Sequence, residues 1–192
     1  MTSSRSIDPQ AVAPESAHDD KPVAPAKLTR ITTEFQERED RILLTGETDA
    51  DEALCLWLTR RMLVRLLPKL FDWLQREVPQ SLAADAIQGF RQQSATAALE
   101  VQEPVRADPD ARQWLVTSVD VSLQGQQVQL VFRGDQPDEA VSLSLRPMPM
   151  RQWLGVLHTQ FRRADWAAEI WPGWMLESLN SSADGGKSNL MH

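Results

Sequence analysis

Few residues in this chain combine the side-chain type and the spacing that catalysis or metal binding requires. The three histidines, His18, His158 and His192, lie far apart, and the single cysteine, Cys55, has no histidine near it in sequence. Metal sites need clustered Cys, His or carboxylate ligands, and a reactive thiol needs a cationic neighbour or a helix N-terminus. We therefore expect no metal, no cofactor and no catalytic residue, and interpret His158 and Cys55 as packing residues.

Within the predicted globular domain, adjacent carboxylates occur in three pairs, and each pair falls in a predicted turn. These pairs are Glu39/Asp40, Asp51/Glu52 and Asp138/Glu139. Acidic residues are expected in turns, where they are solvated and bond to the local backbone. The chain also contains no phosphate-binding GxxxxGK[ST], no GxGxxG after a strand and no GxSxG nucleophile elbow. The sequence therefore favours a protein that is not an enzyme.

A basic stripe is the first feature that indicates binding rather than catalysis. Arg61, Arg65 and Lys69 recur every four residues in a protein of net charge -7. This spacing places all three on one face of a helix. Such a stripe is most often the solvated face of an amphipathic helix. The alternative is a docking surface for an acidic partner, including another copy of this acidic chain.

A tryptophan-rich segment near the C-terminus is the second such feature. The sequence DWAAEIWPGWM places Trp166, Ile170, Trp171 and Trp174 within eleven residues. One interpretation is a strap folded back over the core, because large apolar side chains normally need burial. The other is an aromatic anchor that inserts into a groove of a partner. The sequence leaves both open.

The sequence patterns of the strands and helices that hold these residues occur twice in the chain. Asp51 to Leu58 reads DEALCLWL, and 87 positions later Asp138 to Leu145 reads DEAVSLSL, with five of eight residues identical. An apolar stripe at helical spacing comes after each segment. The residues of the first stripe are Leu63, Leu66, Leu67, Leu70, Phe71 and Leu74, and they align with Met150, Trp153, Leu154, Leu157, His158 and Phe161.

Each unit is predicted to contain three strands and a helix. Alternating apolar residues predict strands at 31–35, 42–45 and 53–58, then at 119–123, 128–132 and 140–145. Thr59 is the predicted N-cap of a helix over 60–76, and Pro147 or Pro149 opens a second helix that runs to 163. We expect an α+β fold of two β-β-β-α repeats with pseudo-two-fold symmetry, in which helices cover antiparallel sheet(s).

The remaining segments complete the predicted organisation. Residues 1–26 and 178–192 are polar and aperiodic, and we predict disordered tails. A single globular domain spans 27–177. Its parts are repeat one at 28–77, a linking helix at 80–101, repeat two at 114–163 and a Trp-rich strap at 164–177.

The two repeats differ in how much apolar surface they carry. Cys55 and Trp57 stand where the second repeat has Ser142 and Ser144. Outside the shared stripe, the first helix has Met62, Val64 and Trp73, where the second has Pro149, Arg151 and Gln160. Repeat one therefore has a second apolar surface. Either the linking helix packs on it, or it forms a homodimer or partner interface.

Composition narrows the compartment and the classes of partner. The chain has 192 residues, of which 42% are hydrophobic and 24% charged, as in ordinary globular proteins. Its acidic balance argues against a generic binder of nucleic acid or anionic membranes. We find no signal-peptide pattern and no apolar run of about 20 residues that could span a membrane. With one cysteine and no internal disulfide, we expect a cytoplasmic protein.

These observations favour a non-catalytic protein–protein interaction protein, such as an assembly factor, adaptor or regulatory subunit, working as an oligomer. One alternative is that the duplicated strand-and-helix units resemble, in architecture alone, PUR-repeat and Whirly-type proteins. That resemblance implies single-stranded nucleic-acid binding, which needs a basic groove studded with aromatic residues. The outward positions here include Glu34 and Asp120 instead. A small-molecule sensor with an apolar pocket between the repeats is the third alternative.

Overall fold

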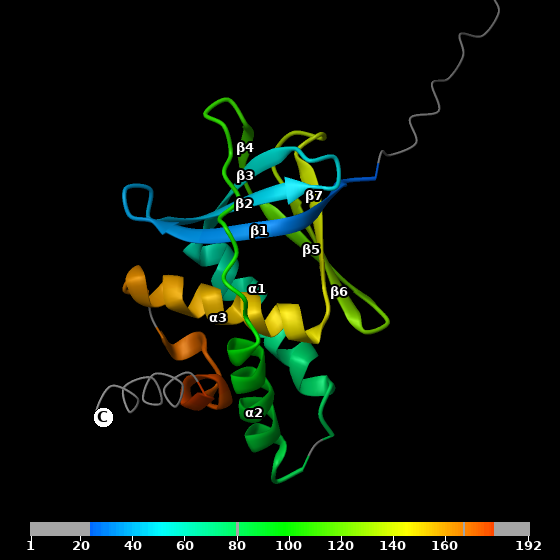
Figure 1. The fold of residues 1–192 in the computed structure, drawn as a ribbon, viewed down its shortest axis with the longest axis vertical. Coiled ribbons are helices and arrows are strands. Elements are labelled where there is room, and N and C mark those ends of the chain that lie inside the picture. The colour runs from blue at the N-terminus through cyan, green and yellow to red at the C-terminus, as the bar shows by residue number, and fades with distance from the viewer. Residues whose placement is uncertain (1–23, 80, 167, 179–192) are drawn as a thin grey trace, which may run out of the picture.

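The computed structural model describes residues 24–79, 81–166 and 168–178 (Figure 1). A curled sheet lies over two crossing helices, and a third helix extends beneath them. The elements in chain order are β1 (Ala26–Gln36), β2 (Arg41–Thr48), β3 (Ala53–Thr59), α1 (Arg60–Arg76), α2 (Ala84–Ala97), β4 (Arg112–Leu115), β5 (Ser118–Gln124), β6 (Gln127–Arg133), β7 (Ala140–Leu145), α3 (Pro147–Arg163) and the short 3₁₀ helix η1 (Ala168–Ile170).

The seven strands form one sheet in the order β4-β3-β2-β1-β7-β6-β5, so the fold is α+β as predicted. Strands β1, β2 and β3 form an antiparallel meander, as do β5, β6 and β7. The pairs β1·β7 and β3·β4 are parallel, so the prediction of a purely antiparallel sheet is wrong at these two junctions. For β3 and β4 the cause is the long helical crossover between them, the kind of connection that parallel strands require.

Helices α1 and α3 begin and end close to the predicted residues. The Thr59 hydroxyl accepts a hydrogen bond from the backbone N–H of Met62 at 3.2 Å, which confirms Thr59 as the N-cap of α1. Helix α3 begins at Pro147, whose fixed φ suits a first helical turn. Both predicted apolar stripes are buried beneath the sheet.

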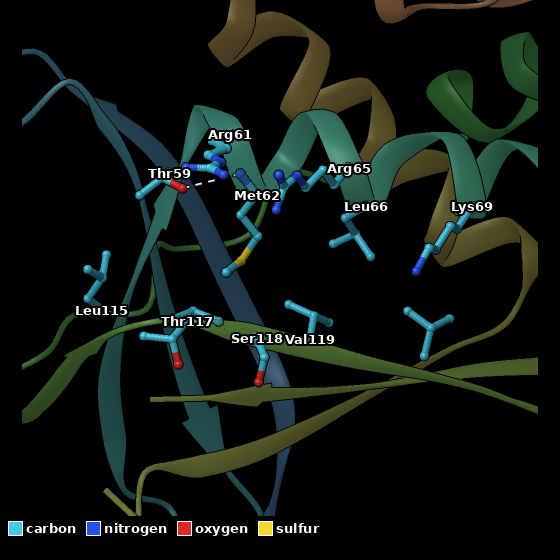
Figure 2. A pocket seen from close by; sticks show the side chains of 12 residues that line it. Thr59, Arg61, Met62, Arg65, Leu66, Lys69, Leu115, Thr117, Ser118 and Val119 are labelled. Carbon is cyan, nitrogen blue, oxygen red and sulfur yellow. Dashed lines mark hydrogen bonds between the residues drawn. The ribbon is translucent and has the colours of Figure 1, made fainter. Parts of the chain in front are cut away.

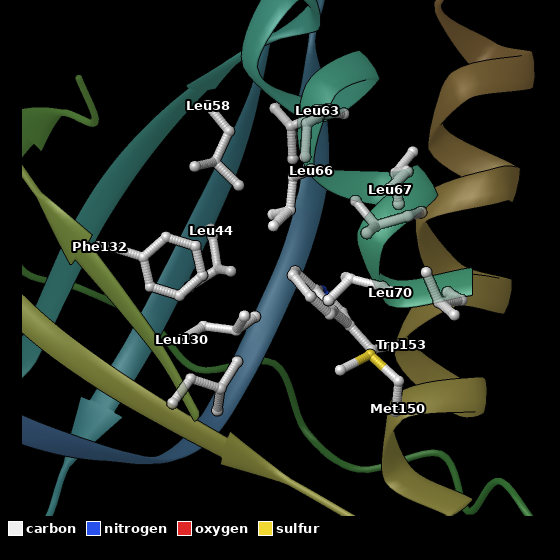
Figure 3. Close-up of a cluster of buried hydrophobic side chains, with 14 of the residues drawn as sticks. Leu44, Leu58, Leu63, Leu66, Leu67, Leu70, Leu130, Phe132, Met150 and Trp153 are labelled. Atoms are coloured by element: carbon white, nitrogen blue, oxygen red, sulfur yellow. The ribbon is translucent and has the colours of Figure 1, made fainter. Parts of the chain in front are cut away.

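The core lies between the concave face of the sheet and these two helices (Figure 3). Strand side chains such as Leu44 and Phe132 meet Leu67 of α1 and Trp153 of α3 there. Full burial of one such side chain contributes roughly 2 kcal/mol. Residues alternate between this face and the opposite face, which is why the period of two in the sequence located the strands.

The Trp-rich segment packs across both helices. Trp166, Trp171 and Trp174 are all buried within this chain. The ring of Trp171 lies 5.5 Å from that of Phe71 on α1 and 5.3 Å from that of Phe161 on α3. The three tryptophans therefore contribute to the core and are withdrawn from the exposed surface of the chain.

Helix α2 is shorter than the predicted helix over 80–101, and it turns a polar face inward. The Gln88 side-chain amide donates to the Leu74 carbonyl at 2.9 Å, and that of Gln92 donates to the Arg151 carbonyl at 3.0 Å. Phe90, on the other side, is 69% exposed. The helix is therefore held in place partly by glutamines that satisfy helix carbonyls.

One interpretation expected the linking helix to cover the second face of β3, and the structure contradicts it. Helix α2 packs on α3 instead, and the segment 98–111 runs past the sheet (Figure 1). This segment is attached by the Val105 N–H, which donates to the Thr32 hydroxyl at 2.8 Å. Of the two predicted disordered tails, all but residues 24–26 and 178 lie outside the described residues.

Candidate functional site: the groove between α1 and β5

An open groove separates helix α1 from the strands β4 and β5 (Figure 2). Its volume is about 440 Å³. Met62 and Leu66 reach into it from α1, and Val119 faces them from β5. Val121 of β5 also lines the groove. Thr59, Thr117 and Ser118 add hydroxyl groups to this apolar lining.

The predicted basic stripe forms one wall of this groove. Arg61, Arg65 and Lys69 all line it, and all three are exposed. Within the described part of the chain, none of them takes part in a salt bridge. Cations at this spacing repel one another, and none of the three forms a close ion pair that would offset the repulsion. The groove therefore presents uncompensated positive charge above an apolar floor.

The other wall is an edge strand. β5 is the last strand of the sheet, and it is paired with β6 alone among the described strands. The β5–β6 hairpin closes through two residues, with Gly125 at φ 60, as a type II′ turn requires at its first position. In a two-residue hairpin the pair beside the turn, which is Gln124↔Gln127 in this register, is expected to be hydrogen-bonded, and bonded and non-bonded pairs then alternate along the ladder. Val119, Val121 and Leu123 therefore direct their N–H and C=O groups away from β6.

The contact between helix α3 and the outward edge of β1 is closed, unlike the groove. Helix α3 lies along β1, and the Gln160 side-chain oxygen accepts a hydrogen bond from the Phe35 N–H at 3.0 Å. The Trp153 N–H donates to the Thr33 hydroxyl at 3.1 Å. Trp166 packs edge-on against Phe35 with 5.6 Å between ring centres. The outward backbone of β1 is therefore capped and covered, whereas that of β5 borders the groove.

The structure brings together only part of the predicted interface. Met62, Arg61, Arg65 and Lys69 meet at the groove. Cys55 and Trp57 are half-buried on the face of β3 opposite the helices, and the Trp57 N–H donates to the Gln113 side chain at 3.1 Å. Val64 is exposed outside the groove lining, Trp73 is buried and Ile170 is half-buried.

Sequence reasoning missed the part of the groove lining formed by Leu115 and Thr117. Residues 103–112, EPVRADPDAR, have the composition of a loop, so the short strand β4 at Arg112–Leu115 was not predicted. A signal was present in Trp114 and Val116, two apolar residues at strand spacing, and both are buried. β4 exists because it pairs with β3, a partner more than 50 residues away in sequence.

In the part of the chain that the structure describes, two titratable groups have a clearly shifted pKa, and both lie away from the groove. Burial, together with Arg91, lowers the pKa of Arg151 to about 10, while Glu77 opposes the shift. The Arg151 guanidinium bonds to the Gln88 side chain and lies 5.4 Å from the Trp174 ring centre. Burial, reinforced by Arg162, also lowers the pKa of His158. Both groups are held by core packing.

The described residues contain no group of three or more His, Cys, Asp or Glu side chains placed to hold a metal ion. No helix in the same part of the chain has the length and apolar character needed to cross a membrane. Comparison with known proteins finds no matching family model, no similar curated protein and no similar solved structure.

Proposed function

We propose that this chain is a non-catalytic protein–protein interaction protein whose docking site is the groove between α1 and β5. The observation that carries the proposal is the row of unpaired cations, Arg61, Arg65 and Lys69, above an apolar floor in an acidic protein. Contact sites combine apolar surface with charge that a partner complements. A ligand that is both acidic and partly apolar fits this lining.

The lining favours a protein over a single-stranded nucleic acid. Proteins that bind single strands stack the bases on aromatic side chains. The described residues that line the groove are aliphatic, hydroxyl-bearing or cationic. A small-molecule sensor would bury most of its ligand in an enclosed cavity. This groove instead runs open along two turns of helix, which suits an elongated partner (Figure 2).

We also infer that the two halves of the chain arose by duplication, so that the groove is the opened counterpart of the α3–β1 contact. The order of three strands and a helix occurs twice. A Cβ added to Gly46 would lie 2.5 Å from a methyl carbon of Leu28. One added to Gly134 would clash with the Glu139 carboxylate and lie 2.7 Å from the Trp114 ring. In each half a glycine therefore leaves room for a side chain from a strand of a parallel junction, and at Gly134 it also leaves room for Glu139. A crystal structure in which residues 28–76 and 115–163 fail to superimpose would contradict the duplication.

Quantitative affinity purification from the native cell tests the docking site. The wild-type chain is compared with a triple charge reversal, Arg61→Glu, Arg65→Glu and Lys69→Glu. Because exposed cations lie elsewhere too, the reversal Arg38→Glu, Arg106→Glu and Arg146→Glu is the matched control of equal charge change. We expect proteins that co-purify with the wild type and the control to be lost from the groove variant. If the groove variant retains the same proteins as the wild type, the proposal is wrong.

A further inference from the structure

We infer that the occupant of the groove is an extended acidic segment of a partner protein that adds to β5 as an eighth strand, with carboxylates beneath α1. This inference rests on the proposed function, because it specifies how a partner uses the same groove. It joins two observations: the row of unpaired cations on α1, and the unpaired backbone edge of β5 directly across from it.

The edge of β5 supplies the backbone half of the recognition. Val119 and Val121 direct their N–H and C=O groups away from β6 while their side chains line the groove. A strand laid along this edge therefore gains main-chain hydrogen bonds and enters the groove at the same time, as in other cases of strand addition. Exposed edges are normally protected by charged side chains, above all lysine, by proline or by a covering element. β5, with the sequence SVDVSLQ, contains no lysine or proline, and its one charged side chain, Asp120, is paired with Arg133 of β6.

The spacing of the cations matches an extended ligand. Residues four apart on a helix are separated by about 6 Å along its axis, and alternate residues of a strand by about 6.7 Å. Side chains at alternate positions of an added strand therefore fall under Arg61, Arg65 and Lys69 in turn. Glutamate suits these positions, because its methylene groups pack beside Val119 and Val121 while its carboxylate reaches the cations.

A second copy of this chain does not suit the same edge. If two β5 edges paired about a two-fold axis, both helical layers would lie on the same face of the joined sheet. The two α1 stripes would then be neighbours, with six cations brought together and no carboxylate between them. Like charges placed across an interface cost binding free energy. The edge therefore selects an acidic segment from a different protein.

Binding of synthetic peptides, followed by fluorescence anisotropy, tests this mode. The probe alternates glutamate with valine. The first control has the same composition with all glutamates at one end, and the second is the alternating peptide N-methylated on alternate backbone amides. We expect the alternating peptide to bind at least about tenfold more tightly than either control, since register and main-chain bonds are each worth on the order of 1 kcal/mol or more. Equal binding of the alternating peptide and either control overturns the inference, as does no binding.

Protein variants locate the bound strand. Charge reversal of Arg61, Arg65 and Lys69 should abolish binding of the alternating peptide, while the control reversal of Arg38, Arg106 and Arg146 should not. Val121→Pro removes an outward N–H without breaking a bond to β6 and should weaken binding at least about tenfold, whereas Val121→Ala should retain most of it. Slower amide hydrogen exchange at Val119 and Val121 with bound peptide gives a readout that does not depend on any variant. Unchanged exchange there contradicts strand addition.

These outcomes separate the two proposals. If cellular partners are lost from the groove variant but the N-methylated peptide binds as well as the unmodified one, the docking site stands and strand addition is wrong. If the groove variant keeps every cellular partner, the proposed function itself is wrong, whatever the peptides do.

Discussion

A long helix lies beside an outward-facing strand at two places in the molecule, and the two contacts differ. The contact of α3 with β1 is closed, whereas that of α1 with β5 is open. Along β1, Gln160 caps the backbone of Phe35 and Trp166 covers its ring. Along β5, Val119 and Val121 face an open groove of about 440 Å³ under a row of cations. Similar strand-and-helix units can therefore yield either a closed core contact or an open surface.

Part of the difference comes from the segment of chain on the C-terminal side of each helix. After α3 the chain turns back, and Trp166, Trp171 and Trp174 pack against α3 and the end of α1. After α1 the chain continues into α2, which packs on α3 and leaves β5 uncovered. The returning tryptophans thus add to the closure of β1 that Gln160 and Trp153 of α3 provide.

The largest effect is expected on the closed side. Trp171→Ala removes a buried ring that touches Phe71, Phe161 and His158, and should lower the free energy of unfolding by about 3–5 kcal/mol. Urea denaturation followed by circular dichroism measures it. The exposed Met148→Ala is the control, with an expected change within about 0.5 kcal/mol. A loss below about 1 kcal/mol for Trp171→Ala would show that the strap does not hold the helices together.

Removing the cap of β1 should have the next largest effect. Gln160→Met keeps the side-chain volume but loses the oxygen that accepts from the Phe35 N–H, which should cost about 1–2 kcal/mol. Hydrogen exchange of the Phe35 amide should accelerate in step with that loss. If exchange at Phe35 is unchanged, the cap is not what protects this edge.

Acid should destabilise the closed side through His158. Burial and Arg162 lower the pKa of His158 from its ordinary value of 6.5. The unfolded chain therefore takes up a proton at a higher pH than the folded chain, so stability is full above about pH 6.5 and falls on acidification below it. His158→Gln should show a smaller fall in Tm between about pH 7.5 and about pH 5. Carboxylates titrate in both proteins and cancel in this difference. Parallel curves would remove His158 as the cause.

The smallest effect on stability is expected in the groove. Replacing Arg61, Arg65 and Lys69 by glutamine removes exposed charges that have no salt-bridge partner in the described chain. Each change should therefore alter the free energy of unfolding by less than about 0.5 kcal/mol, and relief of their mutual repulsion makes a slight gain the expected sign. A large loss, measured by the same urea titration, would mean that these cations serve folding rather than binding.

Local pattern was a good guide to the elements of this chain. The alternation in β3 and the four-residue spacing in α1 come from backbone geometry, which acts on neighbours in sequence. The N-cap at Thr59 and the start of α3 at Pro147 were predicted for the same reason. Helix α2 falls within the predicted range 80–101 but is shorter, and its buried residues Gln88, Gln92 and Ala95 show no apolar stripe from which its packing could have been predicted.

The sequence by itself determined where the strands and long helices lie and that a basic stripe runs along α1, since both result from the period of the side chains. Only the tertiary structure decided that β4 pairs with β3, that the tryptophans turn inward and that the stripe borders an open groove. Those outcomes depend on contacts between residues far apart in sequence, such as the Trp166 N–H with the Asp40 carboxylate, 126 residues apart. A periodic pattern shows which residues lie on the same face of a helix or strand, but not which other part of the chain packs on that face.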